Sequence, residues 1–523
     1  MKSLPAVPNL VHLKKQAKHL LRDVRAGDAA ALRRFRETLP AARNLAAAKA
    51  DVFPFRLHDA QSVVAREYGF VSWIELKRYV EWKRGDRAAR LKSWSMRVLE
   101  GNARQRGLAI RMLREEPDLF ASDPLNAPWL ACAAGDEARL RAQLARMPDF
   151  PKTPGGPLAM LPLIAVTHSR LILEGDFEAG LLNCAKLLLA NGADANDTWT
   201  DPRYPDFPLS ALYGAAGRTH HAGMTKLLLA AGANPNDNES LYHSVESADA
   251  SCTQMLLDAG ARVSGTNAIG RALDYDRIDR LMLLLRCGGD AREGALLHHA
   301  IERGRSLDHV RALIEAGADP QAKDGEGVSV YRMAQMHGRS DIVKLLEARG
   351  ISQALSDEEA FVAACTRGDL EAARALQARA PDVLARLAER QLQAMPQLAA
   401  VGNIAAVRTM LAVGWPREVK TAWQATALNL AMFQGDAAMV GLLLDEGADW
   451  RTTHGFGDNA LGTLSFASQA EDIADPAPRD YAGCARALTG HGVPITAFEG
   501  YSFSPEVTEF IEGRALAGAE PSD

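Results

Sequence analysis

The stretch TALNLAMFQGDAAMVGLLLDEGADW, residues 426–450, decides the fold of this 523-residue chain. Thr426 is a residue type that caps a helix, and Gly435 permits the positive φ of a tight turn between two helices. Gly447 ends the second helix. The apolar residues of that second helix share one face: Met439, Val440, Leu443 and Leu444. Two short antiparallel helices cannot bury such a face alone, so the unit is predicted to stack on copies of itself.

The same unit returns along the chain, each time closed by a glycine in a Leu-rich segment such as LLLANGAD (187–194). The closing glycines are Gly192, Gly232, Gly260, Gly288, Gly317, Gly350, Gly414, Gly447 and Gly492. Their spacings are 40, 28, 28, 29, 33, 64, 33 and 45 residues. The spacing of 64 is nearly two units, and FVAACTRGDLEAARAL (361–376) supplies the missing one.

The unit resembles the ankyrin repeat, because TALNLA…G…VGLLLDEGAD follows the pattern TPLHLA…G…IVKLLLEAGAD nearly position by position. The resemblance covers roughly three-quarters of the chain. It implies an all-α, ankyrin-like solenoid of stacked helix–turn–helix repeats, with about nine to eleven units. It also implies a scaffold that recognises a protein partner through its concave face and long loops.

Four regions are predicted from the change of pattern along the chain. They are a basic helical N-terminal module (1–92), a degenerate repeat region (93–160), the repeat array (161–498), and a C-terminal cap and tail (499–523). A Pro- and Gly-rich segment at 148–162 interrupts the degenerate repeats and is expected to be either an ordered loop or a mobile flap.

The N-terminal module carries an apolar stripe at helical spacing, formed by Leu10, Leu13, Ala17, Leu20 and Val24. Asp59 is expected to cap a helix that runs through Glu67. LPAVPNLVHLKKQAKHLL (4–21) and DAQSVVAREYGFVSWIELK (59–77) resemble the N-terminal segment of many bacterial ankyrin-repeat proteins. This second resemblance implies a bacterial source and no particular activity.

Composition describes a folded protein with an uneven charge. Hydrophobic residues make up 47% and charged residues 24% of the chain. Residues 1–100 carry a balance of +11 and the remainder −16, which suggests different partners or an internal electrostatic contact. No apolar run reaches the ~18 residues of a membrane span, and the first residues lack a signal-peptide core. We therefore expect a cytoplasmic protein without a membrane partner.

Motifs for catalysis, cofactors and metals are missing from the sequence, which contains no GxGxxG after a strand, Walker loop, HExxH or GxSxG. The six cysteines are scattered without a CxxC pair and are expected to be reduced core residues. His298 stands where TPLH places a histidine, so we expect it to hydrogen-bond a neighbouring loop; a ligand role is the alternative. The chain is therefore expected to have no enzymatic activity, no cofactor and no metal.

Two long insertions are candidate partner-binding sites, at 197–208 (DTWTDPRYPDFP) and 451–459 (RTTHGFGDN). Insertions of such arrays emerge on one face, and aromatic and arginine side chains often dominate interfaces. The candidate residues are Trp199, Arg203, Tyr204, Phe207, His454 and Phe456. The alternative is that the aromatic residues of the first insertion fold back and cover the adjacent helices.

A second candidate is a short basic ridge beside the apolar stripe, formed by Lys14, Lys15, Lys18 and Arg22. Such a ridge is either a solvated helix face or a contact for nucleic acid or an acidic protein surface. No aromatic stacking residues are interleaved with it.

Three functions remain open from the sequence. The favoured one is a non-catalytic protein-binding scaffold of unspecified partner. The second is a nucleic-acid-associated regulator that uses the basic module, which a steep loss of affinity with salt would indicate. The third is an enzyme with an unrecognised site, which several ionisable side chains converging in one deep pocket would indicate.

Overall fold

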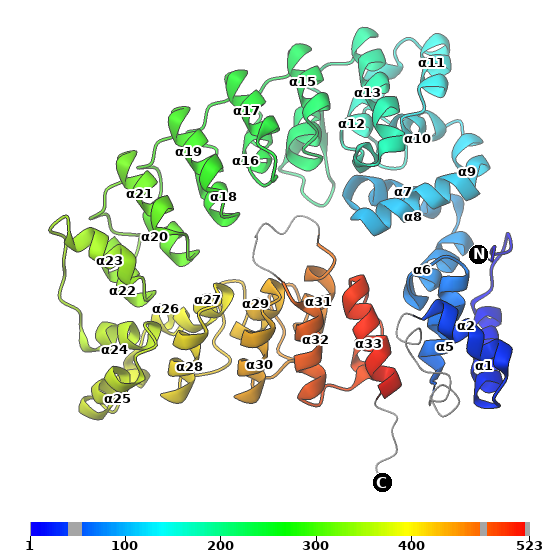
Figure 1. Cartoon of the computed structure of the whole chain (residues 1–523). Coiled ribbons are helices and arrows are strands. Elements are labelled where there is room, and N and C mark those ends of the chain that lie inside the picture. The colour runs from blue at the N-terminus through cyan, green and yellow to red at the C-terminus, as the bar shows by residue number, and fades with distance from the viewer. Residues whose placement is uncertain (1, 40–54, 471–478, 518–523) are drawn as a thin grey trace.

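The computed structural model describes residues 2–39, 55–470 and 479–517. Residues 518–523 of the predicted cap and tail lie outside the described residues. The chain is a row of antiparallel helix pairs that curves into a nearly closed ring (Figure 1). The all-α solenoid of stacked pairs predicted from the sequence is confirmed.

The N-terminal module contains α1 (Leu10–Arg25), α2 (Ala29–Thr38), α5 (Leu57–Glu67) and α6 (Trp73–Arg84). Its apolar stripe packs inward from α1, with Leu13, Ala17 and Leu20 almost fully buried. The predicted start of α5 is wrong by three residues, because the helix begins at Leu57 and its N-cap is Arg56 rather than Asp59. The Asp59 carboxylate stands in the first turn and accepts a hydrogen bond from the Arg56 N–H at 2.7 Å, so it stabilises the helix start from inside.

The degenerate region contains α7 (Arg87–Glu100), α8 (Ala103–Glu115), α9 (Pro117–Ala121), α10 (Ala127–Ala134), α11 (Glu137–Arg146) and the 3₁₀ turn η1 (Phe150–Lys152). The region boundary predicted at residue 92 lies inside α7. The Pro- and Gly-rich loop is ordered against Trp129, whose indole N–H donates to the Thr153 carbonyl at 3.2 Å. A Cβ at Gly155 would lie 2.4 Å from that indole, so the packing requires glycine there.

The first half of the array consists of α12 (Pro162–Thr167), η2 (Arg170–Leu173), α13 (Gly175–Ala190), α14 (Ala211–Tyr213), η3 (Gly214–Arg218), α15 (Ala222–Ala230), α16 (Ser240–Ser244), α17 (Ser251–Asp258), α18 (Ala268–Asp274), α19 (Ile278–Arg286), α20 (Leu296–Glu302) and α21 (Leu307–Glu315). The second half consists of α22 (Val330–Met336), α23 (Ser340–Glu347), α24 (Asp357–Thr366), α25 (Leu370–Arg379), η4 (Val383–Arg386), α26 (Glu389–Leu392), α27 (Ala394–Ala400), α28 (Ile404–Ala412), α29 (Ala427–Gln434), α30 (Ala437–Asp445), α31 (Ala460–Ala467), α32 (Tyr481–Gly490), η5 (Ile495–Phe498) and α33 (Pro505–Ala517).

The turn chemistry of residues 426–450 is as predicted. The Thr426 side chain accepts a hydrogen bond from the Asn429 N–H at 3.3 Å and caps α29. Gly435 has φ 68°, and Gly447 has φ 84°. All nine closing glycines have positive φ, which a side chain would strain, and α24 and α25 are the helix pair that the long spacing concealed.

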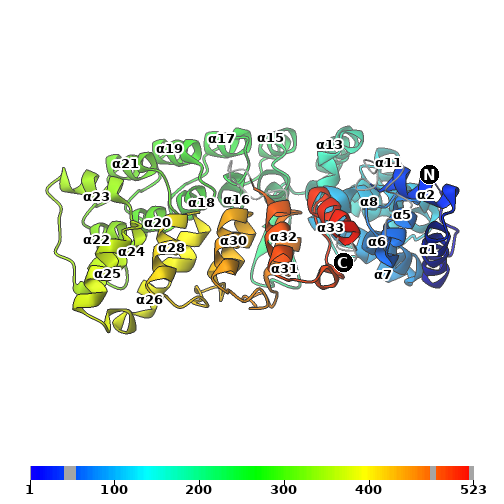
Figure 2. The same cartoon turned by 60° about the horizontal axis from the view of Figure 1, so that its bottom comes forward.

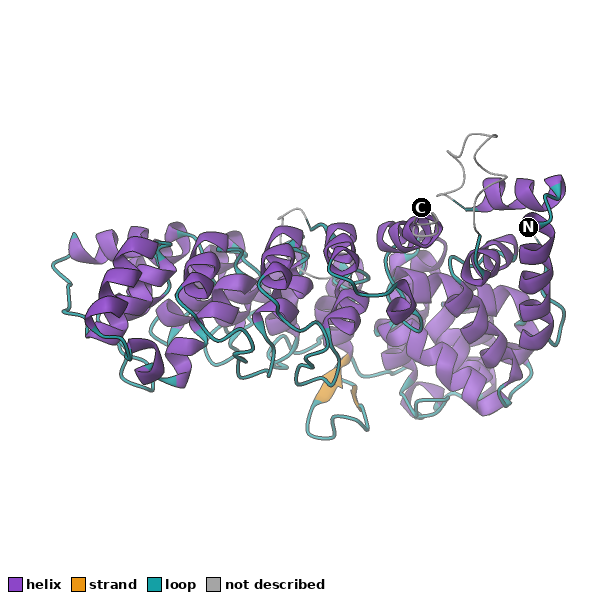
Figure 3. Cartoon of the chain, turned by 90° about the horizontal axis from the view of Figure 1, so that it is seen from below, coloured by secondary structure: helices purple, strands orange, loops and turns teal. Residues whose placement is uncertain are grey.

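The first insertion forms a short β-hairpin that the sequence did not predict. Strands β1 (Thr198–Thr200) and β2 (Pro208–Ser210) pair antiparallel, with Trp199 opposite Leu209. The Trp199 side chain is 8% exposed, and its indole N–H donates to the Leu158 carbonyl at 3.0 Å. The hairpin projects from one face of the ring, as Figure 3 shows.

The curvature of the array brings its two ends together. In Figures 1 and 2 the C-terminal helix α33 lies beside α5 and α6 of the N-terminal module. Arg66 on α5 pairs with Glu512 on α33 at 2.9 Å, and Arg104 on α8 donates to the Phe503 carbonyl. The N-terminal module and the C-terminal cap therefore close the ring by covering each other.

A substitution of Leu443 tests the packing between stacked units, because this side chain is buried where α30 meets its neighbours. We expect Leu443→Ala to lower the free energy of unfolding by ~2–5 kcal/mol, measured by urea denaturation. Leu125→Ala, at a side chain that is 78% exposed, is the control and should change it by less than about 0.5 kcal/mol. Equal effects of the two variants would contradict the proposed packing.

A substitution of Glu512 tests the closure of the ring. Burial raises the pKa of its carboxyl above the ordinary value, and the opposing charge of Arg66 only partly offsets this. The folded chain therefore holds the Glu512 proton more tightly than the unfolded chain does. The stability that the protonated carboxyl contributes is present below about pH 4.5 and is lost as the pH rises through the folded-state pKa. We expect Glu512→Gln to be more stable than wild type at pH 7 and no more stable at pH 4.

The measurement is urea denaturation of both proteins at the two pH values. Glu509→Gln, at an exposed carboxyl of the same helix, is the matched control and should leave stability nearly unchanged. A Glu512→Gln protein that is less stable than wild type at pH 7 would show that the ion pair with Arg66 outweighs burial.

Candidate binding surfaces

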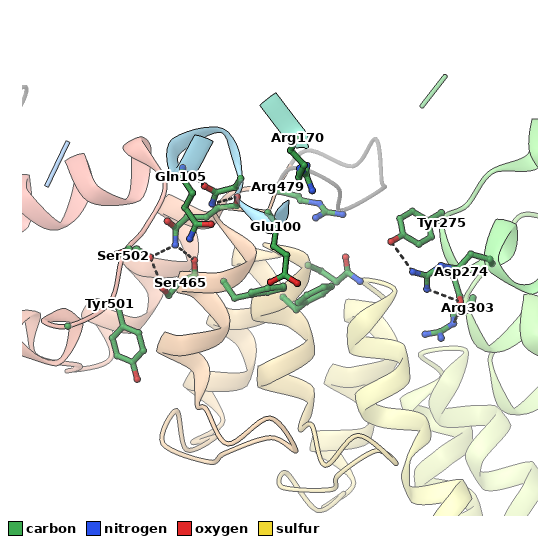
Figure 4. Close-up of a pocket in the computed structure, with 18 of the residues that line it drawn as sticks. Glu100, Gln105, Arg170, Asp274, Tyr275, Arg303, Ser465, Arg479, Tyr501 and Ser502 are labelled. Atoms are coloured by element: carbon green, nitrogen blue, oxygen red, sulfur yellow. Dashed lines mark hydrogen bonds and ion pairs between the residues drawn. The ribbon is translucent and has the colours of Figure 1, made fainter. Parts of the chain in front are cut away.

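The inner wall of the ring surrounds a cavity of 760 Å³, called the central cavity below. It is lined by the first helices of pairs on both arms, among them α18, α29 and α31, by the turn that follows α20, and by the segment between α7 and α8 (Figure 4). Its charged lining residues are the arginines Arg78, Arg170, Arg271, Arg303, Arg305 and Arg479, and the carboxylates Glu100 and Asp274. Arginine therefore dominates the described lining.

On one arm the arginines are paired with acids. Asp274 lies 2.8 Å from Arg303 and 2.9 Å from His299. Burial opposes ionisation of Asp274, but the hydrogen bond from His299 and the charge of Arg303 outweigh it and lower the pKa. Arg271 pairs with Glu246 at 2.7 Å, so the positive charge of this arm is largely compensated.

On the other arm two arginines meet neutral partners. Arg78 donates to the Ser502 hydroxyl at 3.4 Å, and Arg479 to the Tyr481 hydroxyl at 3.3 Å. Within the described ranges, neither guanidinium has a carboxylate within 4.0 Å. These two guanidinium groups of the described wall therefore meet hydroxyl groups rather than carboxylates.

An aromatic pair also lines the central cavity. Phe433 on α29 and Phe466 on α31 stack with ring centroids 6.4 Å apart and planes 17° apart. Phe466 is 67% exposed although it follows a run of buried residues on α31. The wall thus combines guanidinium groups with an open aromatic face.

The predicted residues of the first insertion differ in how far they are exposed. Trp199 covers the neighbouring Pro- and Gly-rich loop, whereas Tyr204 and Phe207 are 60% and 59% exposed. Arg203 pairs with Asp201 and with Glu100 of the cavity wall. The hydrogen bonds to Asp201 and then to Glu100 raise the pKa of the Arg203 guanidinium, so this arginine is held by acids of its own chain.

The second insertion exposes aromatic residues at a loop. Phe456 is 81% exposed and stacks on Trp423, which is 67% exposed, with planes 12° apart. His454 lies at the edge of Phe456, and its Nδ1 accepts from the Phe456 N–H at 3.2 Å. Trp423 was not predicted from the sequence, because its loop precedes a unit of ordinary spacing. The only available signal was a tryptophan within a polar loop.

The two insertions belong to opposite arms of the ring, between α13 and α14 and between α30 and α31 (Figure 1). The predicted partner-binding residues therefore form separate patches on different loops. Whether either patch binds a partner remains a prediction.

The basic ridge lies on α1, at the edge of the ring away from the central cavity (Figure 1). Lys14, Lys15 and Lys18 are exposed, and none has a carboxylate within 4.0 Å in the part of the chain that the structure describes. Arg22 pairs with Asp23 at 2.8 Å. The ridge is therefore accessible, and its role remains a prediction.

His298 has the structural role expected of it. Its side chain is buried, and its Nε2 lies 2.8 Å from the Val328 carbonyl oxygen in the next unit. Across residues 2–39, 55–470 and 479–517, no group of three histidine, cysteine, aspartate or glutamate side chains could hold a metal ion. The same described ranges contain no helix long and apolar enough to span a membrane.

Comparisons with known proteins identify one repeat directly. Residues 295–325, which contain α20 and α21, match the family model of the ankyrin repeat. The crystal structure of the human ASB11 ankyrin repeat domain is similar at 20% sequence identity and a TM-score of 0.34, over 44% of this chain and 100% of that chain. No curated protein matches the sequence. Ankyrin repeats are in general non-catalytic protein–protein interaction modules, and this chain contains one.

Proposed function

We propose that this protein is a non-catalytic scaffold that binds a protein partner through the long loops and the concave face of its array. The observation that carries the proposal is the stacked pair of Trp423 and Phe456, two large aromatic side chains that are 67% and 81% exposed. Exposed aromatic side chains of this size are frequent anchors of protein interfaces.

The aromatic pair is held in place before any partner arrives. The Gly455 N–H donates to the Trp423 carbonyl at 3.0 Å, and the Lys420 ammonium donates to the Thr453 carbonyl at 3.0 Å. These bonds tie the loop before α29 to the loop before α31. Binding would therefore cost little loop ordering, which favours affinity.

The remaining parts of the proposal rest on the sequence. The acidic body of the array and the interaction role common to ankyrin repeats support a soluble protein partner. A cytoplasmic location and a bacterial source are part of the proposal, on the sequence features described above.

The proposal predicts the loss of a captured protein when the aromatic pair is removed. The full chain is immobilised and exposed to cytoplasmic extract, beside the variant Trp423→Ala/Phe456→Ala. We expect the captured partner to fall by ~10-fold or more, since interface anchors contribute about 2 kcal/mol or more each. The matched control is Leu125→Ala, another exposed apolar side chain, which should retain capture.

The variant Tyr204→Ala/Phe207→Ala tests the other insertion in the same assay. Loss of capture there would assign binding to the hairpin. Undiminished capture by both double variants would contradict loop-mediated recognition.

The exposed lysines of the ridge favour a second candidate function, contact with nucleic acid. If it is correct, Lys14→Gln/Lys15→Gln/Lys18→Gln should weaken binding to a double-stranded DNA or RNA fragment and flatten its salt dependence. Fluorescence anisotropy at about 50 and 200 mM salt measures both effects. The matched control is Lys186→Gln/Lys226→Gln/Lys344→Gln, which removes three exposed lysines elsewhere on the array. Equal losses for the two triple variants would contradict a role of the ridge.

A further inference from the structure

We infer that the tip of the β-hairpin, residues 201–207, is the docking site for a segment of the protein partner that is rich in arginine and lysine. The inference rests on the proposed scaffold function, because it names the chemistry that one of the long loops recognises. It combines the exposed aromatic side chains of the hairpin tip with the carboxylates around them.

The hairpin tip presents two large aromatic side chains to solvent. Tyr204 and Phe207 are 60% and 59% exposed, and they lie between the strands of a hairpin that projects from one face of the ring (Figure 3). The Tyr204 N–H donates to the Asp201 carbonyl at 2.8 Å, and the Phe207 N–H donates to the Tyr204 carbonyl at 3.2 Å. The tip is therefore shaped before a partner arrives, and binding costs little loop ordering.

Two neighbouring loops place carboxylates around the tip. The loop that contains the hairpin, 191–210, lies beside the loop 231–239, because the Ser210 hydroxyl donates to the Asp237 carboxylate. Every residue of the two loops is described. Arg203 is their one lysine or arginine. Their carboxylates are those of Asp194, Asp197, Asp201, Asp206, Asp237 and Glu239.

The cations of this region are already engaged, whereas most of the carboxylates are not. Arg203 pairs with Asp201 and with Glu100 of the cavity wall, and Glu239 pairs with His243 at 3.3 Å. Four carboxylates have no lysine, arginine or histidine nitrogen within 4.0 Å in the part of the chain that the structure describes. These are Asp194, Asp197, Asp206 and Asp237.

The titration of Asp197 agrees with a locally negative field. Burial and then the charge of Asp194 raise the pKa of Asp197 to about 6. One oxygen of Asp197 is buried without a hydrogen-bond donor among the described residues. A cation brought to this surface would relieve both the repulsion and the missing donor.

A basic protein segment satisfies both the aromatic and the acidic feature. Arginine and lysine place their charge over aromatic rings, cover apolar surface with their aliphatic stems, and donate to carboxylates. The tip already contains this contact within the chain, since the Arg203 guanidinium lies 5.8 Å from the centroid of the Tyr204 ring and pairs with Asp201. The carboxylates would repel a phosphate-bearing partner.

The test is fluorescence anisotropy of the full chain with a labelled peptide of alternating arginine and serine, beside a peptide with glutamine in place of arginine. We expect only the arginine peptide to bind at ~50 mM salt, with an affinity that falls as salt rises. Asp194→Asn/Asp206→Asn should weaken it by ~5-fold, as expected for the loss of two exposed ion pairs. The matched control is Asp258→Asn/Glu315→Gln, which removes two exposed carboxylates from α17 and α21 and should bind as wild type.

Tyr204→Ala/Phe207→Ala tests the aromatic contribution with the same peptide. It should weaken the arginine peptide by ~5-fold, because cation–π contacts and stem packing are lost. Leu125→Ala/Met282→Ala, which removes two exposed apolar side chains elsewhere, is the control and should leave the affinity unchanged. Thermal melts establish that every variant is folded.

Three outcomes would overturn the inference. They are failure of the arginine peptide to bind the folded wild type, equal binding of the glutamine peptide, and equal losses in the hairpin variants and their controls. Capture of a protein from extract, and its dependence on Trp423 and Phe456, would still test the scaffold function separately.

Discussion

Each helix pair of this array has apolar residues on both of its sides, and no pair can bury both sides without two neighbours. The burial of Met439, Val440 and Leu443 in the unit at 426–450 illustrates the constraint, since a single unit would leave these side chains in water. Stability therefore accumulates from the seams between units rather than from one central core. The tight turns at Gly435 and Gly447 keep the connections between helices short, so that the helix pairs can stack on one another.

The same constraint applies at the two ends of the row, where the outermost unit of a solenoid lacks a neighbour and needs a cap. Here the N-terminal module and α33 cap each other, which turns an open array into a closed ring. The contact includes a polar pair, Arg66 and Glu512, and the pKa of Glu512 is raised because burial outweighs the attraction to Arg66. Closure of the ring is therefore sensitive to the charge of Glu512.

The features of the fold that depend on short-range chemistry could be predicted from the sequence. A glycine in a Leu-rich segment marks a turn whatever surrounds it, so the closing glycines and the capping threonine Thr426 were predicted correctly. Closure of the ring depends on the curvature of many stacked units together, so no local sequence pattern predicts it. The central cavity was missed for the same reason, because Arg78 and Arg479 are 401 positions apart in the sequence. The hairpin at 198–210 was missed because its strands are only three residues long.

The first insertion links the outer loops to the inner wall. Glu100 lines the central cavity, and the arginine that pairs with it, Arg203, comes from the insertion. Without Arg203, the Glu100 carboxylate would face the same space as Arg78 and Arg479 without this counter-charge. The insertion is thus electrostatically part of the cavity wall as well as a surface loop. A side chain 103 positions away in the sequence thereby helps to set the charge of the cavity wall.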